Sequence, residues 1–353
     1  MSSFSTPAAS ATTWIRGLAL VGLVLCFVVV VLGAYVRLNA AGLGCPDWPG
    51  CYGHLTPTGA EQNAAAQAAY PNMPLHTGKA WKEMIHRYAA STLGLIIVVI
   101  TALAISLRKL RVVSVPLTVG LLITVVVQGI LGMLTVTWLL KPLIVTLHLI
   151  FGLTTLSLLW WLFLSLRTGT RGGVRFAGAH SSNLSAYPDR VAPPHRAMLV
   201  GLIALGIQIS LGGWTSSNYA AVACPDFPKC QNSWVPEMDY KDAFVLWRGL
   251  GVNYEGGVLQ HPARVAIHYT HRLGAIAATL ALLFAAIATL RRKVRAGARL
   301  AAYVVLGALG LQLFIGASMV LEGFPLALAT AHNAGAALLL LASVALYRFL
   351  RYP

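Results

Sequence analysis

Long apolar runs alternate with short polar segments along most of the chain. A transmembrane helix needs roughly 17 to 25 predominantly apolar residues to cross the hydrocarbon core of a bilayer, and eight runs meet this requirement. We therefore predict eight transmembrane helices, near residues 14–36, 86–107, 113–137, 143–166, 196–215, 268–290, 299–321 and 325–347. The first run has about twenty uncharged residues and no convincing cleavage site, so we expect it to remain as a helix and not to be removed as a signal peptide.

Composition places the chain in the same class. Of its 353 residues, 57% are hydrophobic and only 10% are charged, whereas a soluble domain carries about 25% charged residues. The expected fold class is an all-α polytopic membrane protein.

The net charge of +16 could indicate nucleic-acid binding, but the basic residues are distributed according to membrane topology. With the N-terminus inside, the segments on that side carry sixteen basic residues and one acid, Asp189, and the opposite side carries ten basic and nine acidic residues. This is the positive-inside bias of membrane proteins. It predicts that both termini are cytoplasmic and that the partner surface is the lipid bilayer and not nucleic acid.

The second half of the sequence repeats the first. The motif Cys45-Pro-Asp-Trp-Pro-Gly-Cys51 returns as Cys224-Pro-Asp-Phe-Pro-Lys-Cys230 at an offset of 179, and four further features recur at offsets of 184 or 185. These are His86 and His271, Gln128 and Gln312, Gly132 and Gly316, and His148 and His332. Because each half has an even number of spans, both copies keep one orientation. We predict two tandem four-helix bundles related by a pseudo-twofold axis along the membrane normal.

Domain boundaries follow from this repeat. Residues 1–13 are a cytoplasmic N-terminal tail, residues 14–166 the N-terminal half and residues 196–353 the C-terminal half. Residues 167–195 are basic and rich in Gly, Ser and Pro, which indicates a cytoplasmic linker between the halves.

Four of the five cysteines lie in the two long loops assigned to the outside: Cys45, Cys51, Cys224 and Cys230. Disulfides persist on that oxidising side of the membrane, so one disulfide within each loop is expected. Free thiols and a thiol-exchange pair are the alternatives.

Each half also places two histidines near the outer ends of two different helices, His86 and His148 in the first half and His271 and His332 in the second. At 1.5 Å per residue, each lies about 8 to 10 Å below the start of its helix. Two imidazoles on facing helices can ligate one haem iron axially. A lone histidine is more often a polar side chain satisfied by backbone or water, and zinc would lack further ligands. The repeat of the whole pattern favours two haem sites.

Two other residue types accompany these histidines. Arg87 and Arg272 follow their histidines by one residue, where a guanidinium can pair with haem propionates or snorkel to the interface. Gln128 and Gln312 are interpreted as interhelical contacts and not as catalytic groups.

The halves differ three residues before the first histidine, where one has Glu83 and the other His268. A buried carboxylate beside a haem is a candidate proton acceptor for C–H oxidation. The alternative for Glu83 is an ion pair with a neighbouring lysine or with Arg87. His268 competes with His271 as a ligand, but the repeat aligns His271 with His86.

These motifs resemble the heme A synthase family from the first helix to the last. The resemblance rests on Gly42-Leu-Gly-Cys-Pro-Asp-Trp-Pro-Gly-Cys51, Trp81-Lys-Glu-Met-Ile-His-Arg87, His148, the second cysteine motif, His271-Arg272 and His332. It implies an eight-helix membrane enzyme that oxidises the C8 methyl group of haem O to the formyl group of haem A for terminal oxidases. His268 and the long second outer loop depart from the family pattern.

The resemblance also implies roles for individual residues. His86 and His148 would hold the substrate haem, His271 and His332 a resident haem B, and Glu83 would lie near the substrate methyl group. The cysteines would pair as Cys45–Cys51 and Cys224–Cys230, as in the bacterial branch of the family, which implies a bacterial cell (inner) membrane as the location. Haem O synthase and cytochrome oxidase assembly factors are the implied protein partners, and a homo-oligomer is compatible with it.

Three other functional classes remain open. A bis-histidine membrane cytochrome b would use the same four histidines only to transfer electrons. A transporter with parallel repeats would have broken helices near the midplane, and a membrane thiol oxidoreductase would leave the histidines unexplained.

Overall fold

The computed structural model describes residues 7–167 and 194–352. Within these residues the secondary structure consists of helices and isolated β-bridges, with no β-strand. Eight helices are long and apolar enough to cross a membrane, which confirms the number predicted from hydropathy. They are α1 (Pro7–Leu38), α4 (Thr77–Ser106), α5 (Val115–Thr137), α6 (Pro142–Arg167), α7 (His195–Ser217), α9 (His261–Leu290), α10 (Ala296–Leu321) and α11 (Leu326–Arg351).

The connections contain short helical segments. They are α2 (Pro57–Glu61), α3 (Ala64–Ala68), α8 (Tyr240–Ala243) and the 3-10 turns η1 (Arg108–Leu110) and η2 (Ala221–Ala223). Side-chain caps define the first two: Thr56 accepts from the N–H of Gly59, and Asn63 accepts from the N–H of Ala66. Such caps satisfy N–H groups that have no partner inside the helix.

Two long helices begin before the apolar runs that predicted them. α4 begins at Thr77 instead of near residue 86, and α9 begins at His261 instead of near residue 268. The additional turns contain polar and charged residues, which lower the local hydropathy. These turns are stable because the adjacent loops supply hydrogen-bond partners, as described below for Glu83.

The structure tests only part of the boundaries predicted for the N-terminal tail and the linker. α1 begins at Pro7, so part of the expected tail of residues 1–13 is helical. Most of the expected linker, residues 167–195, lies outside the described residues.

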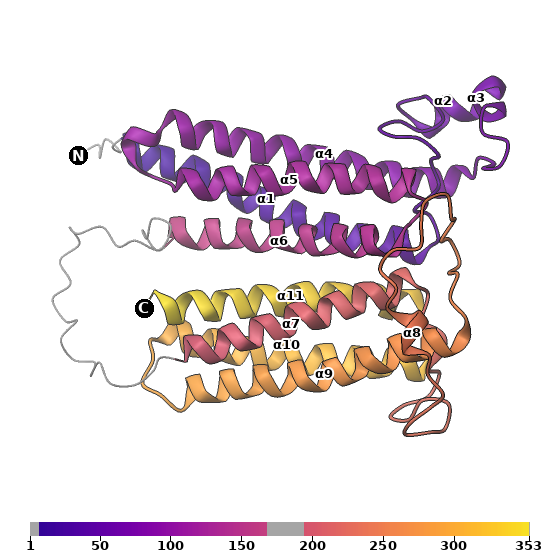
Figure 1. The fold of residues 1–353 in the computed structure, drawn as a ribbon. Coiled ribbons are helices and arrows are strands. Elements are labelled where there is room, and N and C mark those ends of the chain that lie inside the picture. Colours follow the sequence, from indigo (N-terminus) through magenta and orange to yellow (C-terminus); the bar gives the residue numbers. More distant parts are fainter. Residues whose placement is uncertain (1–6, 168–193, 353) are drawn as a thin grey trace.

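The eight long helices lie roughly parallel in two neighbouring groups (Figure 1). α1, α4, α5 and α6 pack together, and α7, α9, α10 and α11 pack together. Contacts of α1 with α11, and of α6 with α7 and α11, join the groups. The segments with α2, α3 and α8 lie at one end, here called the loop end. α1 begins and α11 ends at the opposite, terminal end.

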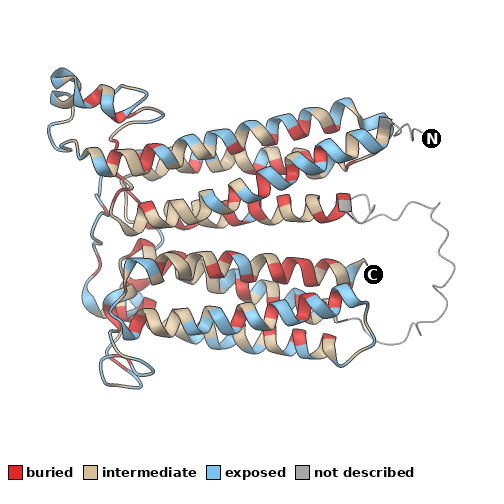
Figure 2. Ribbon diagram, turned by 180° about the vertical axis from the view of Figure 1, so that it is seen from behind, coloured by how far each residue is buried: buried red, intermediate tan, exposed pale blue. Residues whose placement is uncertain are grey.

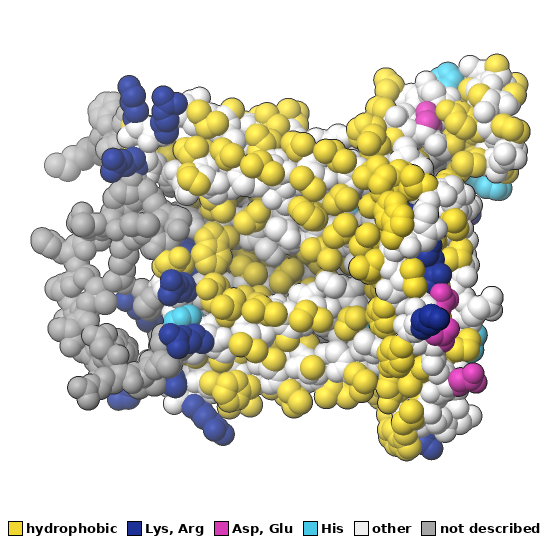
Figure 3. Space-filling view, viewed as in Figure 1, with side chains coloured by type: hydrophobic (Ala, Val, Ile, Leu, Met, Phe, Trp, Pro, Cys, Tyr) yellow, Lys and Arg dark blue, Asp and Glu magenta, His cyan; other side chains and the backbone are white. Residues whose placement is uncertain are grey.

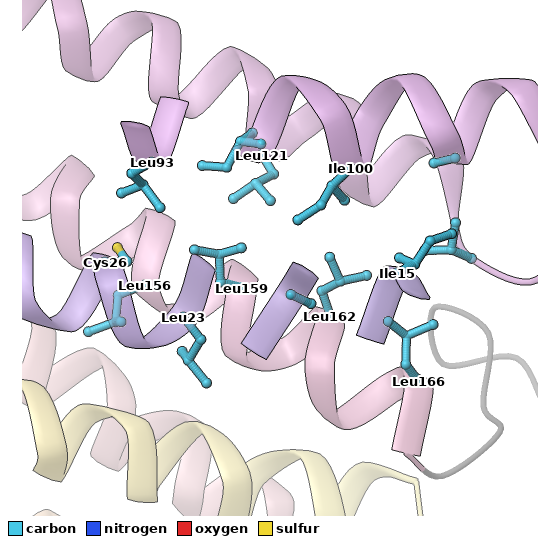
Figure 4. Close-up of a cluster of buried hydrophobic side chains, with 14 of the residues drawn as sticks. Ile15, Leu23, Cys26, Leu93, Ile100, Leu121, Leu156, Leu159, Leu162 and Leu166 are labelled. Carbon is cyan, nitrogen blue, oxygen red and sulfur yellow. The ribbon is translucent and has the colours of Figure 1, made fainter. Parts of the chain in front are cut away.

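Apolar side chains fill the interior of each group. Figure 4 shows one cluster in which Ile15, Leu23, Leu93 and Leu159 converge from α1, α4 and α6. An equivalent cluster joins α7, α9, α10 and α11. In a lipid environment this packing is stabilised by close van der Waals contacts between the helices and not by removal of the side chains from water.

The outward faces of the long helices are apolar as well. Leu95, Phe284 and Phe314 are exposed large hydrophobic side chains, and exposed residues run along the outer helices of both groups (Figure 2). A water-soluble protein of this size would cover such surfaces with charge. Helices that are apolar on both faces match a lipid environment, and the chain is a multi-pass membrane protein.

Charged side chains gather at the two ends of the molecule. On the face shown in Figure 3, Lys and Arg lie at both ends, whereas Asp and Glu of the described residues are seen only at the loop end. Between them the surface is almost free of charge over the length of the helices.

The loop between α7 and α9 crosses to the other group of helices. The buried Lys141, before α6, donates to the carbonyl of Gly249. Its ammonium lies 3.2 Å from the ring centroid of Trp247, within the range of a cation–π interaction. The N–H of Tyr254 donates to the carbonyl of Leu139 at 3.0 Å. These contacts tie the loop of the second half to the α5–α6 turn of the first.

Replacing Lys141 by Met tests this tie. We expect the free energy of unfolding in detergent to fall by about 2 kcal/mol, because a hydrogen bond from a charged donor contributes about 1.5–3 kcal/mol. Lys109, exposed in η1, provides the control: Lys109→Met is expected to change stability by less than about 0.5 kcal/mol. Equal thermal unfolding midpoints for the two variants would contradict a stabilising role for Lys141.

Candidate functional site

Two loops with a common architecture cover the loop end of the helices. Each contains a disulfide, Cys45–Cys51 in one and Cys224–Cys230 in the other, as predicted. An isolated β-bridge between the second cysteine and the residue three positions later closes each loop. The repeated cysteine motif therefore corresponds to a repeated structure.

An aspartate shapes the turn inside each loop. Asp47 accepts hydrogen bonds from the N–H groups of Tyr52 and Gly53 at 2.6 and 2.7 Å. Asp226 accepts from the N–H groups at the same two motif positions at 2.6 and 2.9 Å. Burial opposes ionisation of Asp226, but these two N–H groups and the Arg272 guanidinium outweigh it and hold the pKa below its ordinary value. The acceptor is therefore ionised at neutral pH.

An arginine fastens each loop to the helix below it. Arg87 on α4 donates to the carbonyls of Asp47 and Gly50 at 2.9 and 2.5 Å. Arg272 on α9 donates to the carbonyls at the same two motif positions, at 2.8 and 2.7 Å. The sequence predicted either haem propionates or the interface as the partner of these arginines, and it did not predict these loop carbonyls.

The residue one turn before each arginine distinguishes the halves. Glu83 is 4% exposed, and its carboxylate accepts from Arg87 at 2.5 Å and from the N–H of Cys45 at 2.9 Å. His268 is also 4% exposed, and its Nε2 accepts from Nε of Arg272 at 3.2 Å. The ion pair that the sequence left open for Glu83 is therefore present. A buried carboxylate takes the place of a buried imidazole.

The four predicted histidines come together as two pairs at this end of the helices. His86 on α4 interacts electrostatically with His148 on α6, and His271 on α9 interacts with His332 on α11. The Nδ1 atoms of His86 and His148 are buried and have no hydrogen-bond partner. Because an unpaired buried nitrogen is unfavourable, these rings are suited to a further ligand.

A glycine on a neighbouring helix makes room for each imidazole. The pairs are Gly33 with His86, Gly132 with His148, Gly212 with His271 and Gly316 with His332. A Cβ at any of these glycines would lie 2.9 to 3.2 Å from a ring carbon, tighter than ordinary van der Waals contact. The rings therefore sit directly against the backbone of the next helix.

Three of the imidazoles also contact a glutamine amide four residues before that glycine. The closest nitrogen–nitrogen distances are 3.4 Å for Gln128–His148, 3.1 Å for Gln208–His271 and 3.3 Å for Gln312–His332. The sequence pattern predicted only interhelical contacts for Gln128 and Gln312, and it did not point to Gln208. The recurrent spacing of Gln and Gly on helices that precede a histidine helix is the signal that identifies all three.

The donor set fits haem better than a protein-only metal site. No group of three or more His, Cys, Asp or Glu side chains that could hold a metal ion occurs within residues 7–167 and 194–352. Two imidazoles are the axial ligands that a haem iron takes, with the porphyrin supplying the other four. In the first group of helices, the buried and unpaired Nδ1 atoms of His86 and His148 match this requirement.

Comparison with known proteins agrees with this geometry. The COX15-CtaA family model, described as "Cytochrome oxidase assembly protein", matches residues 16–344. A protein of Shewanella oneidensis named "Heme A synthase" is 42% identical over 343 residues, covering 96% of each chain. "Heme A synthase" of Rhizorhabdus wittichii is 27% identical over 338 residues, covering 90% of this chain and 89% of the relative.

Gly33→Ala tests the close packing against His86. The added Cβ would lie 2.9 Å from the ring, so we expect the ring to move and stability to fall by about 1–3 kcal/mol. Gly17→Ala, on the same helix with nothing within 4 Å, should instead stabilise the helix by up to about 1 kcal/mol. Thermal unfolding of both variants in detergent measures the difference. A Gly33→Ala variant as stable as Gly17→Ala would contradict this packing constraint.

Proposed function

The chain belongs to the COX15-CtaA family, and from this membership we propose that it is an oxidoreductase that converts haem O to haem A. The reaction oxidises the C8 methyl group of haem O to a formyl group, and the product serves terminal oxidases. The observation that carries the proposal is the presence of two half-buried histidine pairs, one in each group of helices, in a chain similar to heme A synthases over 96% of its length.

The histidine pairs receive different haems in this proposal. His86 and His148 hold the substrate haem O, and His271 and His332 hold a resident haem B. The arrangement is supported by one imidazole pair in each group of helices and, in the N-terminal half, by the buried Nδ1 atoms of His86 and His148, which lack hydrogen-bond partners. When bound, haem B would supply one-electron transfer.

The assignment of substrate to the N-terminal half rests on Glu83. Oxidation of a methyl carbon releases protons, and a fixed carboxylate beside the substrate can accept them. Two hydrogen bonds, from Arg87 and from the N–H of Cys45, fix the Glu83 carboxylate between helix and loop. The C-terminal half has His268 at this position, with its Nε2 bound by Arg272 and its Nδ1 without a hydrogen-bond partner. His271 is proposed as the ligand there because the repeat aligns it with His86.

For Arg87 and Arg272 the contacts support a positioning role. Their guanidinium groups donate to loop carbonyls, so each holds a disulfide loop over the histidine pair beneath it. A loop held in this way excludes water from the site, which strengthens electrostatic interactions inside it. Direct pairing with a haem propionate is the other role proposed for these side chains.

The two halves, residues 14–166 and 196–353, form tandem four-helix bundles related by a pseudo-twofold axis along the membrane normal. The proposal is supported by the repeated loop, arginine and histidine contacts. The cell membrane is the proposed location, with both termini cytoplasmic. Basic residues at the terminal end and disulfides at the opposite end support this orientation. Haem O synthase, oxidase assembly factors and a second copy of the chain are the proposed partners.

A haem census of the purified protein tests the proposed function. We expect haem O or haem A together with haem B when the pigments are extracted and separated by chromatography. Haem B alone would contradict the proposal and would instead indicate a bis-histidine cytochrome b that only transfers electrons.

His148→Ala should remove the substrate haem and leave haem B in place. Loss of an outer partner of a metal ligand already costs about 10–100-fold in affinity, so we expect the retained haem O and haem A to fall at least about tenfold. His76→Ala is the control, because His76 is an exposed residue that makes no capping hydrogen bond. Optical spectra and extracted pigments measure both haems, and retention of both in His148→Ala would count against the pairing.

Glu83→Ala should keep both haems yet accumulate haem O or a hydroxylated intermediate. Removal of a general base lowers turnover by about 100-fold or more, and haem A formation is measured by pigment chromatography. Glu83→Gln provides a matched variant, because an amide oxygen can still accept from the N–H of Cys45. Normal haem A output from either variant would remove Glu83 from the mechanism.

A further inference from the structure

The four imidazoles have unequal surroundings at one register position. Four residues before the glycine that packs against each ring, three helices carry a glutamine and one carries valine. The four residues are Val29 on α1, Gln128 on α5, Gln208 on α7 and Gln312 on α10. The ring that lacks an amide is His86, whose polar neighbour on α1 is the backbone of Val29.

A second feature changes together with the glutamine. One turn after the other three histidines, a glycine on the histidine helix makes room for the amide: Gly152, Gly274 and Gly335. A Cβ at Gly152 would lie 3.2 Å from the Gln128 amide nitrogen, and at the other two glycines it would lie too close to the amide oxygen for any real contact. After His86 the chain has Ala89 and Ala90. Both the amide and the space for it are therefore missing at His86.

A glutamine amide at this position acts on the imidazole as an outer partner. The side-chain oxygens of all three glutamines are buried and have no hydrogen-bond partner, and each belongs to an amide whose nitrogen lies within 3.5 Å of a ring nitrogen. The amide nitrogens of Gln208 and Gln312 also donate to the backbone carbonyls of His271 and His332, both at 3.0 Å. An outer partner that fixes the orientation of a ligating histidine raises the affinity of a metal site.

We propose that Val29, by leaving His86 without an amide partner, makes His86 the exchangeable ligand through which substrate haem enters and product haem leaves. This inference rests on the proposed function. In the C-terminal half both imidazoles have a glutamine, so the resident haem is held on both sides. In the N-terminal half only His148 has one, so the haem is held firmly on one side and released from the other. Val29 is a positioning residue that acts through His86.

The direct test adds the missing amide. Val29→Gln combined with Ala89→Gly places a glutamine and the matching glycine at the fourth position. The purified full chain is mixed with excess apoglobin, and loss of each haem is followed by its absorption spectrum. We expect the haem O and haem A of this variant to dissociate at least about tenfold more slowly than those of the unmodified protein, with haem B dissociation unchanged.

A size-matched control separates the amide from the change in packing. Val29→Leu with Ala89→Gly fills the same space without a hydrogen-bonding group and should release substrate haem at the original rate. Haem B content reports whether each variant is folded. Equal substrate-haem dissociation rates for the glutamine and leucine variants, with haem B intact, would overturn the inference.

The converse substitutions keep the test decisive if the glutamine variant does not assemble. Gln312→Val should accelerate haem B loss at least about tenfold and leave the substrate haem unaffected, and Gln128→Val should accelerate substrate-haem loss alone. Unchanged rates in both would overturn the inference. Haem B alone in both halves of the unmodified protein would contradict the proposed function instead, so the two failures give different results.

Discussion

The need to accommodate four imidazoles inside an apolar helix bundle governs the loop end of this protein. A ring nitrogen buried among hydrocarbon costs free energy unless it has a partner, and a ring between two helices needs space that most side chains would occupy. Glycine on the adjacent helix supplies the space at all four rings. The backbone and, at three rings, a glutamine amide supply polar contacts. The imidazole rings therefore set how closely the neighbouring helices can approach at the loop end.

The disulfide loops depend on the same helices. Arg87 and Arg272 each project from the turn that follows a histidine and bind loop carbonyls. A loop closed by a short disulfide has few conformations available before it docks, so the arginine fixes one compact unit. Glu83 belongs to the same network in the N-terminal half. Its carboxylate is held by contacts with the loop as well as by its own helix.

Much of this organisation could be predicted from the sequence, and the remainder depends on packing. The spans were predictable because apolar length is a local property, and the histidine pairs were predictable because the repeat aligned them. The start of α4 at Thr77 was not, since its polar first turns are stabilised by a loop. Gln208 lies 63 residues before His271, and only the folded chain brings them together. The carbonyl partners of Arg87 are backbone atoms, to which no sequence pattern points.

The contact between Lys141 and the loop that covers it has no counterpart at the equivalent position of the other half. At the repeat offset of 184 the position of Lys141 corresponds to Pro325, which has no charge to bury. The contact therefore runs in one direction only, from the loop of the second half to the α5–α6 turn of the first. It makes the two groups of helices inequivalent at the loop end, so a change in this loop is felt directly by the neighbouring group.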